Sequence, residues 1–124
     1  MSIKNRLSEL QEQALLTNEH SFVDETISML NDGRLYLFDL GDRFTLLMPR
    51  DYDGCPCVHV YFAWTNKKTF FADNYKFVAD RAAEIGAKYI TFSTANKSVE
   101  RLALRHGWAK ISQDGILSEW IIEL

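Results

Sequence analysis

Apolar residues recur at helical spacing in several segments of the chain. In the first of these, Ile3, Leu7, Leu10 and Ala14 follow one another in steps of four, three and four residues, with charged and polar residues between them. Such a stripe lies on one face of an amphipathic helix. The same spacing predicts helices over residues 2–17, 22–31, 69–85 and 97–106.

Residues at the ends of these segments support the predicted boundaries. Ser21 and Asn96 precede helices and carry side-chain oxygens that can accept hydrogen bonds from the first free backbone N–H groups. Gly86 and Gly107 follow helices, where a left-handed residue commonly ends the last turn. Ile85 is expected to be the last buried residue of the third helix.

Between the helices the apolar period changes from about four to two. Alternation and short apolar runs predict strands over residues 35–40, 43–48, 57–64, 89–92, 108–111 and 117–122. Gly41 and Asp42 are expected to form a tight turn that makes a hairpin of the first two strands. Asp114 and Gly115 do the same for the last two. Residues 49–56 are polar and are expected to form a loop.

The order of these elements predicts the fold. Residues 57–64 are almost all apolar, as in a strand buried on both faces. The strand–helix–strand unit from residue 57 to residue 92 predicts parallel pairing through a right-handed crossover. The hairpins on either side make the sheet mixed. We therefore expect an α/β fold, a mixed central sheet flanked by helices in a single domain over residues 1–124.

Composition excludes several classes of protein. The chain has 124 residues, 47% of them hydrophobic, with 3 Trp, 5 Tyr and 8 Phe, which is enough for a sizeable core. A net charge of -3 argues against a nucleic-acid binder, which needs a basic face. No apolar run approaches the roughly 18 residues of a membrane span. The start of the chain has no secretory pattern, so we expect the cytoplasm of the source cell or of a host.

Cys55, Cys57 and His59 suggest a metal site, since all three fall on one face of an extended strand. Alternate strand residues are separated by roughly 6.6 Å, so the outer two lie about 13 Å apart. One zinc ion with ligand bonds of about 2.0–2.3 Å cannot span that distance unless the chain bends at Pro56. We therefore expect no metal, and interpret these side chains as small residues at the entrance of a strand.

The last third of the chain carries a more specific pattern. A strand is followed by Asn96, a helix containing Leu102, then Gly107 and the aromatic Trp108. This arrangement resembles the late motif of the GNAT superfamily of acetyl-CoA-dependent N-acetyltransferases. The predicted helix over 69–85 would then be the one that follows the family's cofactor loop. The resemblance implies the GNAT acyl-CoA N-acyltransferase fold, acetyl-CoA as cofactor, and an amine or protein as acceptor.

The sequence departs from the family pattern at two positions. The family's loop after the central strand is rich in glycine, and its backbone N–H groups hold the CoA pyrophosphate. Here no glycine lies between Gly54 and Gly86. Many members place a general-acid tyrosine where this chain has Ala103. Small GNAT-like proteins with eroded cofactor loops occur among tailed-phage proteins, and this sequence resembles that kind.

The resemblance suggests catalytic and phosphate-binding residues, each with a structural alternative. His59 and Tyr61 share one face of the central strand by alternation, where the family often places the base that deprotonates the amine. Alternatively, both are core residues with polar tips satisfied internally. Lys67 and Lys68 would neutralise the cofactor's phosphates, or are simply solvated lysines.

Three further residues are candidates for cofactor binding. Trp64 would line the ligand groove, with backbone N–H groups near it stabilising the oxyanion, or it packs in the core. Thr65 opens the loop that takes the place of the family's cofactor loop. Asn96 would contact the cofactor or serve as an ordinary N-cap.

Three functions fit these observations. The first is an N-acetyltransferase whose activity is weak or lost, with the strands over 57–64 and 89–92 splayed to admit the pantetheine arm. The second is a catalytically degenerate GNAT-like binding or structural protein, such as a phage particle component in the virion or an inhibitor of a host factor. The third is an unrelated α/β interaction module that forms homo-oligomers.

Overall fold

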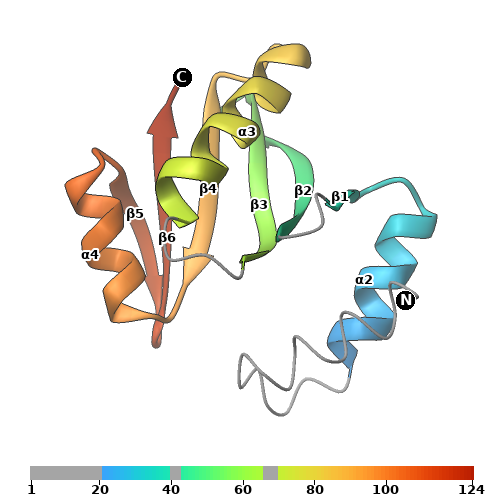
Figure 1. Cartoon of the computed structure of the whole chain (residues 1–124), viewed down its shortest axis with the longest axis horizontal. Coiled ribbons are helices and arrows are strands. Elements are labelled where there is room, and N and C mark those ends of the chain that lie inside the picture. The colour runs from blue at the N-terminus through green and yellow to red at the C-terminus, as the bar shows by residue number, and fades with distance from the viewer. Residues whose placement is uncertain (1–20, 40–42, 66–69) are drawn as a thin grey trace.

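The computed structural model describes residues 21–39, 43–65 and 70–124 of the chain (Figure 1). In chain order its elements are α2 (Ser21–Asn31), β1 (Tyr36–Asp39), β2 (Arg43–Tyr52), β3 (Cys55–Thr65), α3 (Phe70–Glu84), β4 (Tyr89–Thr94), α4 (Lys97–Arg105), β5 (Ala109–Asp114) and β6 (Leu117–Glu123). The helix expected over residues 2–17 lies outside the described residues.

The strands form one six-stranded sheet in the order β1-β2-β3-β4-β6-β5. β3 and β4 pair in parallel, and every other neighbouring pair is antiparallel. The predicted mixed sheet is therefore confirmed, including the crossover through α3. As Figure 1 shows, α2 lies beyond the β1 edge and α4 lies at the opposite, β5 edge.

Helices α3 and α4 contribute to one hydrophobic core. The register pairs Val58 with Ile90 and Ile90 with Ile122, which puts these side chains on one face of the sheet. Val78 and Ala82 of α3 pack in the same cluster. Further fully buried members come from the other elements: Leu47, Ala87, Ala103, Trp108 and Trp120. Both helices therefore cover the face that carries Val58.

The predicted helix boundaries hold with small corrections. Asn96 is the N-cap of α4, as expected, because its side chain accepts hydrogen bonds from two backbone N–H groups of the first turn. Ser21 is the first residue of α2 rather than its N-cap. Ile85 was expected to be buried, but its side chain is 53% exposed. Ile85 follows Glu84, the last residue of α3, so its side chain is no longer on the helix face that packs on the sheet.

The expected loop over residues 49–56 is wrong. β2 continues to Tyr52, and a two-residue turn at Asp53 and Gly54 leads directly into β3. Both turn residues have positive φ, 51° and 79°, as in the type I′ turn that suits the twist of a hairpin. Pro49 is tolerated because β1 pairs with β2 only as far as Leu47, so one side of β2 is a sheet edge at the proline.

Substitution of Gly54 tests this hairpin. Its φ of 79° is strained for any residue with a Cβ, while the space around the position is open. We expect Gly54→Ala to lower the free energy of unfolding by about 1–2 kcal/mol. Gly54→Asn, which tolerates positive φ, should cost clearly less. Urea denaturation of both variants measures this, and equal losses would contradict a purely conformational cause.

Candidate functional site

The parallel strands β3 and β4 pair over only part of their length. Their ladder contains four residue pairs and ends at Val60 and Phe92. β3 continues to Thr65, and β4 continues to Thr94 along its other neighbour, β6. A splay was predicted between residues 57–64 and 89–92, but all of residues 89–92 pair with β3, and the two strands diverge only beyond Phe92 (Figure 1). This gap opens at the carboxyl ends of both strands, where ligands bind in open α/β sheets.

A β-bulge in β3 lies where the gap begins. Leu47 of β2 pairs with Val60 of β3, but the adjacent Leu46 pairs with Phe62, so Tyr61 is an extra residue in β3. A bulge of this kind bends its strand and increases the local twist. It also interrupts the simple alternation that would place Tyr61 on the face of His59.

His59 lies one residue before the point of separation and bridges the two strands. It pairs with Thr91 across the parallel ladder, and its Nδ1 lies 2.8 Å from the Thr91 hydroxyl oxygen. Both residues are buried, with 9% and 2% of their surface exposed. If Nδ1–H donates to this hydroxyl, Nε2 carries the lone pair of the neutral ring.

The surroundings of His59 keep its ring uncharged. Burial lowers the pKa of His59 from 6.5 to about 4, and the positive charge of Arg50 on the neighbouring strand adds to the effect. The imidazole is therefore neutral at physiological pH. A neutral imidazole can accept a proton, although one with a low pKa holds it weakly.

The cysteines near His59 are free thiols. Cys57 is buried, and burial is the main cause that raises its pKa, so it stays protonated and poorly nucleophilic. Within residues 21–39, 43–65 and 70–124, no three histidine, cysteine, aspartate or glutamate side chains lie close enough to hold a metal ion.

The other predicted site residues lie around the open end of the gap or outside the described chain. Trp64 and Thr65 are in the part of β3 beyond its ladder with β4. Lys67 and Lys68 fall outside the described residues. Asn96 follows the end of β4, and its Oδ1 accepts hydrogen bonds from the N–H groups of Ser98 and Val99 at 2.8 and 3.3 Å. That oxygen is thus used by the helix cap.

Ala103 is enclosed by the core. It has no exposed surface and belongs to the cluster between α4 and the sheet. Aromatic rings fill the neighbouring space: Trp108 contacts Phe92 edge to face, with ring centres 4.9 Å apart, and Tyr75 of α3 at 6.3 Å. This packing accounts for a small residue at position 103.

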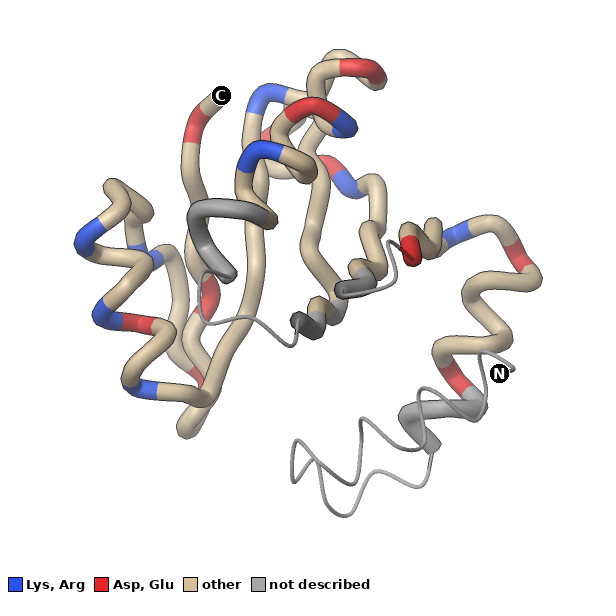
Figure 2. The backbone as a smooth tube through the Cα atoms, in the orientation of Figure 1, with Lys and Arg blue, Asp and Glu red and all other residues tan. Residues whose placement is uncertain are grey.

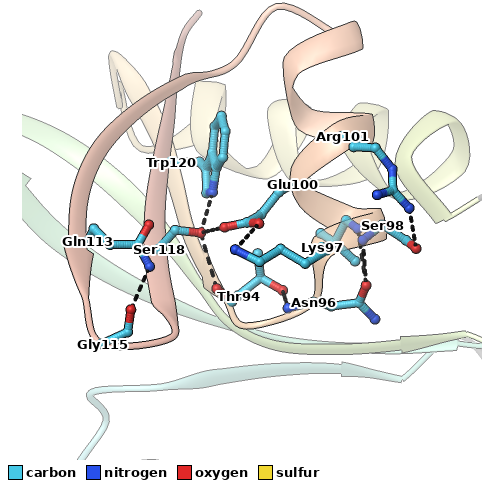
Figure 3. A network of polar contacts seen from close by, with 11 residues as sticks. Thr94, Asn96, Lys97, Ser98, Glu100, Arg101, Gln113, Gly115, Ser118 and Trp120 are labelled. Atoms are coloured by element: carbon cyan, nitrogen blue, oxygen red, sulfur yellow. Dashed lines mark hydrogen bonds and ion pairs between the residues drawn. The ribbon is translucent and has the colours of Figure 1, made fainter.

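A buried polar network beside the gap was not anticipated from the sequence (Figure 3). Ser118 of β6 lies 2.6 Å from a carboxylate oxygen of Glu100 in α4, and the indole N–H of Trp120 donates to the Ser118 hydroxyl at 2.8 Å. Glu100 precedes Ala103 by three residues, so it occupies the inner face of the helix. The spacing of three residues between Glu100 and Ala103 is the feature of the sequence from which an inward-facing Glu100 could have been predicted.

The outer face of α4 is basic. Figure 2 shows lysine and arginine recurring along this helix, where Lys97, Arg101 and Arg105 are all exposed. Lys97 forms an ion pair with Glu100 at 3.2 Å. Glu100, the acidic residue of α4, is turned inward, so the solvent-exposed face of this helix carries mainly positive charge.

Comparisons with known proteins identify the fold. No protein-family profile and no curated protein sequence matches this chain. Among solved structures, a GNAT-family acetyltransferase from Listeria monocytogenes 4b F2365 aligns with a TM-score of 0.69 at 10% identity, over 98% of this chain and 85% of its own. The Drosophila melanogaster polyamine N-acetyltransferase, which forms N-acetylagmatine, aligns with a TM-score of 0.61 at 13% identity. The alignment covers 86% of this chain and 82% of that enzyme.

A third structure, the NatC complex bound to Gag peptide and CoA, aligns with a TM-score of 0.60 at 10% identity, over 82% of this chain and 79% of that one. These identities are low, so the likeness bears on architecture rather than activity. No helix in the described part of the chain is long and apolar enough to cross a membrane. The mixed sheet with its divided β3–β4 pair is the GNAT acyl-CoA N-acyltransferase fold.

The low pKa of His59 predicts a loss of stability in acid. Because the unfolded chain binds a proton at His59 near pH 6.5 and the native state only near pH 4, stability should fall as the pH drops through this window. The difference between the two pKa values corresponds to a loss of about 3 kcal/mol at most in the free energy of unfolding. Urea unfolding at several pH values should show a shallower acid dependence for His59→Gln than for the natural chain. Parallel curves would contradict a neutral, buried His59.

Proposed function

We propose that this chain binds acetyl-CoA in the gap between β3 and β4 and transfers its acetyl group to an amine. The observation that carries this proposal is the separation of the two strands beyond Val60 and Phe92, in a sheet of the acyltransferase architecture. A gap between parallel strands exposes backbone groups that would otherwise pair, and these can bind an extended amide-containing arm.

Structures of the same fold support this ligand class. The NatC complex was solved with CoA and a peptide, and another structure of the same fold, AtaTR, with acetyl-CoA. The polyamine N-acetyltransferase of Drosophila melanogaster acts on an amine. For this chain we propose an acyl-CoA and an amine or protein acceptor, in the cytoplasm of its source or host.

Each candidate residue has a role in this proposal. Lys67 and Lys68 neutralise the phosphates. The side-chain oxygen of Asn96 caps α4, which leaves the side-chain amide N–H groups of Asn96 to donate to the pantetheine arm. Trp64 and Thr65 belong to the part of β3 that has no partner in β4, so their backbone groups could contact the arm. His59, with Tyr61 as the alternative, accepts the proton that the amine nitrogen loses as it bonds to the acetyl carbon. The carbon–sulfur bond breaks, and the released thiolate takes a proton from water.

Two features predict a slow reaction. The segment after β3 has no glycine, so the backbone cannot approach a pyrophosphate as closely as a glycine loop allows. Ala103 provides no hydroxyl to protonate the thiolate. The same features favour a second function, in which a catalytically degenerate domain binds a partner, as in a phage particle or against a host factor.

Titration with acetyl-CoA tests the proposal. A ligand that binds only the native state raises the melting temperature in a saturable way. We expect such stabilisation by acetyl-CoA. A flat response at millimolar concentrations would contradict the proposal and favour the catalytically degenerate protein.

The lysine pair offers a sharper test of how the cofactor binds. Removing two phosphate contacts should weaken binding, so Lys67→Ala combined with Lys68→Ala is expected to raise the dissociation constant for acetyl-CoA about tenfold or more. Lys88→Ala is the matched control, because this exposed lysine precedes β4 at the end of the sheet away from the gap. Equal affinities for the double variant and the control would contradict a phosphate-binding role.

A further inference from the structure

We propose that Glu100 and Ser118 are positioning residues that hold the end of β4 against β6, so that the gap between β3 and β4 stays open to its ligand. This inference rests on the proposed function. It assigns a task to a polar network that the late motif of the sequence does not explain.

Among the strands that the structure describes, β6 alone pairs with the end of β4. Ser93 and Thr94 lie beyond the last pair with β3 and continue the ladder with Glu119 and Ser118 of β6. The Ser118 hydroxyl also lies 3.2 Å from the backbone carbonyl oxygen of Thr94. These contacts therefore all lie on the edge of β4 that faces β6 and not on the edge that faces β3.

The chain that follows β4 is fixed by the same group of residues. The backbone N–H of Asn96 donates to the Thr94 hydroxyl at 3.1 Å, and Asn96 then caps α4. One turn along the helix, Glu100 reaches back to Ser118. Strand end, connection and helix thus form one hydrogen-bonded unit around a buried hydroxyl (Figure 3).

The Ser118 hydroxyl has a single proton, and its partners decide where that proton points. The Glu100 carboxylate at 2.6 Å is closer than the Thr94 carbonyl at 3.2 Å, so the hydroxyl donates to the carboxylate. Its oxygen accepts from the Trp120 indole at 2.8 Å. Lys97 contacts the second carboxylate oxygen at 3.2 Å and balances its charge.

A buried carboxylate is a costly means of attaching a helix, because an apolar contact of the same size stabilises a protein at least as well. What the network adds is direction, since hydrogen bonds fix the angle between α4, β6 and the end of β4. On the other wall of the gap, the bulge at Tyr61 bends β3. The Thr45 hydroxyl of β2, buried beside β3, donates to Asn74 of α3 at 3.1 Å. Each wall therefore has its own polar anchor.

The test compares acetyl-CoA binding in variants that remove or keep the hydrogen bonds. Ser118→Ala leaves both Glu100 and Trp120 without their partner, and we expect a dissociation constant at least fivefold higher. Glu100→Gln keeps an oxygen that accepts from Ser118 and should stay within twofold of the natural chain. Glu100→Leu removes that oxygen and should resemble Ser118→Ala. Calorimetric titration well below the melting temperature measures all three.

A matched control separates positioning from stability. Leu35→Ala removes a buried side chain next to β1, far along the sheet from β4, and should destabilise the protein without changing the affinity for acetyl-CoA. Hydrogen exchange gives a readout that needs no ligand. The amides of Ser93 and Thr94 should exchange faster in Ser118→Ala than in Leu35→Ala at equal global stability. If Ser118→Ala fails to fold, Glu100→Leu, which removes the carboxylate that accepts from the Ser118 hydroxyl, takes its place in the exchange measurement.

The outcomes distinguish this inference from the proposed function. If the natural chain does not bind acetyl-CoA, the proposed function fails, and local exchange at Ser93 and Thr94 alone decides whether the network holds β4. If the natural chain binds, and Ser118→Ala and Glu100→Leu bind equally well with unchanged exchange at β4, the positioning role is overturned. Weaker binding in Leu35→Ala to the same degree would also overturn it.

Discussion

The structure depends on the unequal pairing of its central strand. β3 pairs with β2 along its whole length, from Cys55 to Thr65, but with β4 only from Cys57 to Val60. A buried strand with unused pairing groups on one side needs another partner for them, because unsatisfied backbone groups are costly. The end of the β3–β4 ladder is therefore a departure from regular sheet structure that leaves backbone groups of β3 without a partner in β4.

Polar side chains are buried where this departure has to be stabilised. His59 and Thr91 join the two strands just before they separate. Beyond that point each strand is held from its outer side, β4 by the contacts of Ser118 and β3 by its long ladder with β2. Most side chains packed between α3, α4 and the sheet are apolar, so the few buried hydrogen bonds there, such as those of Ser118, add directional contacts to the packing.

The sequence predicted the parts of this structure that depend on local periodicity. The stripe through Val78 and Ala82, the cap at Asn96 and the parallel crossover all follow from spacing and element order. The Asp53–Gly54 hairpin was missed because the polar residues over 49–56 suggested a loop, and only the edge position of Pro49 shows why a strand tolerates it. The bulge at Tyr61 depends on register between strands, which periodicity within one strand does not contain.

The separation of β3 and β4 does not depend on the two positions where the sequence departs from the GNAT pattern. The gap arises from strand pairing and from contacts among β4, β6 and α4, and neither requires a glycine after β3 or a tyrosine at position 103. Ala103 is fully buried and allows α4 to pack closely beside Trp108. A domain of this construction can therefore keep the divided β3–β4 pair while position 103 serves the packing of α4. The separation of the strands and the packing at position 103 thus rest on different residues.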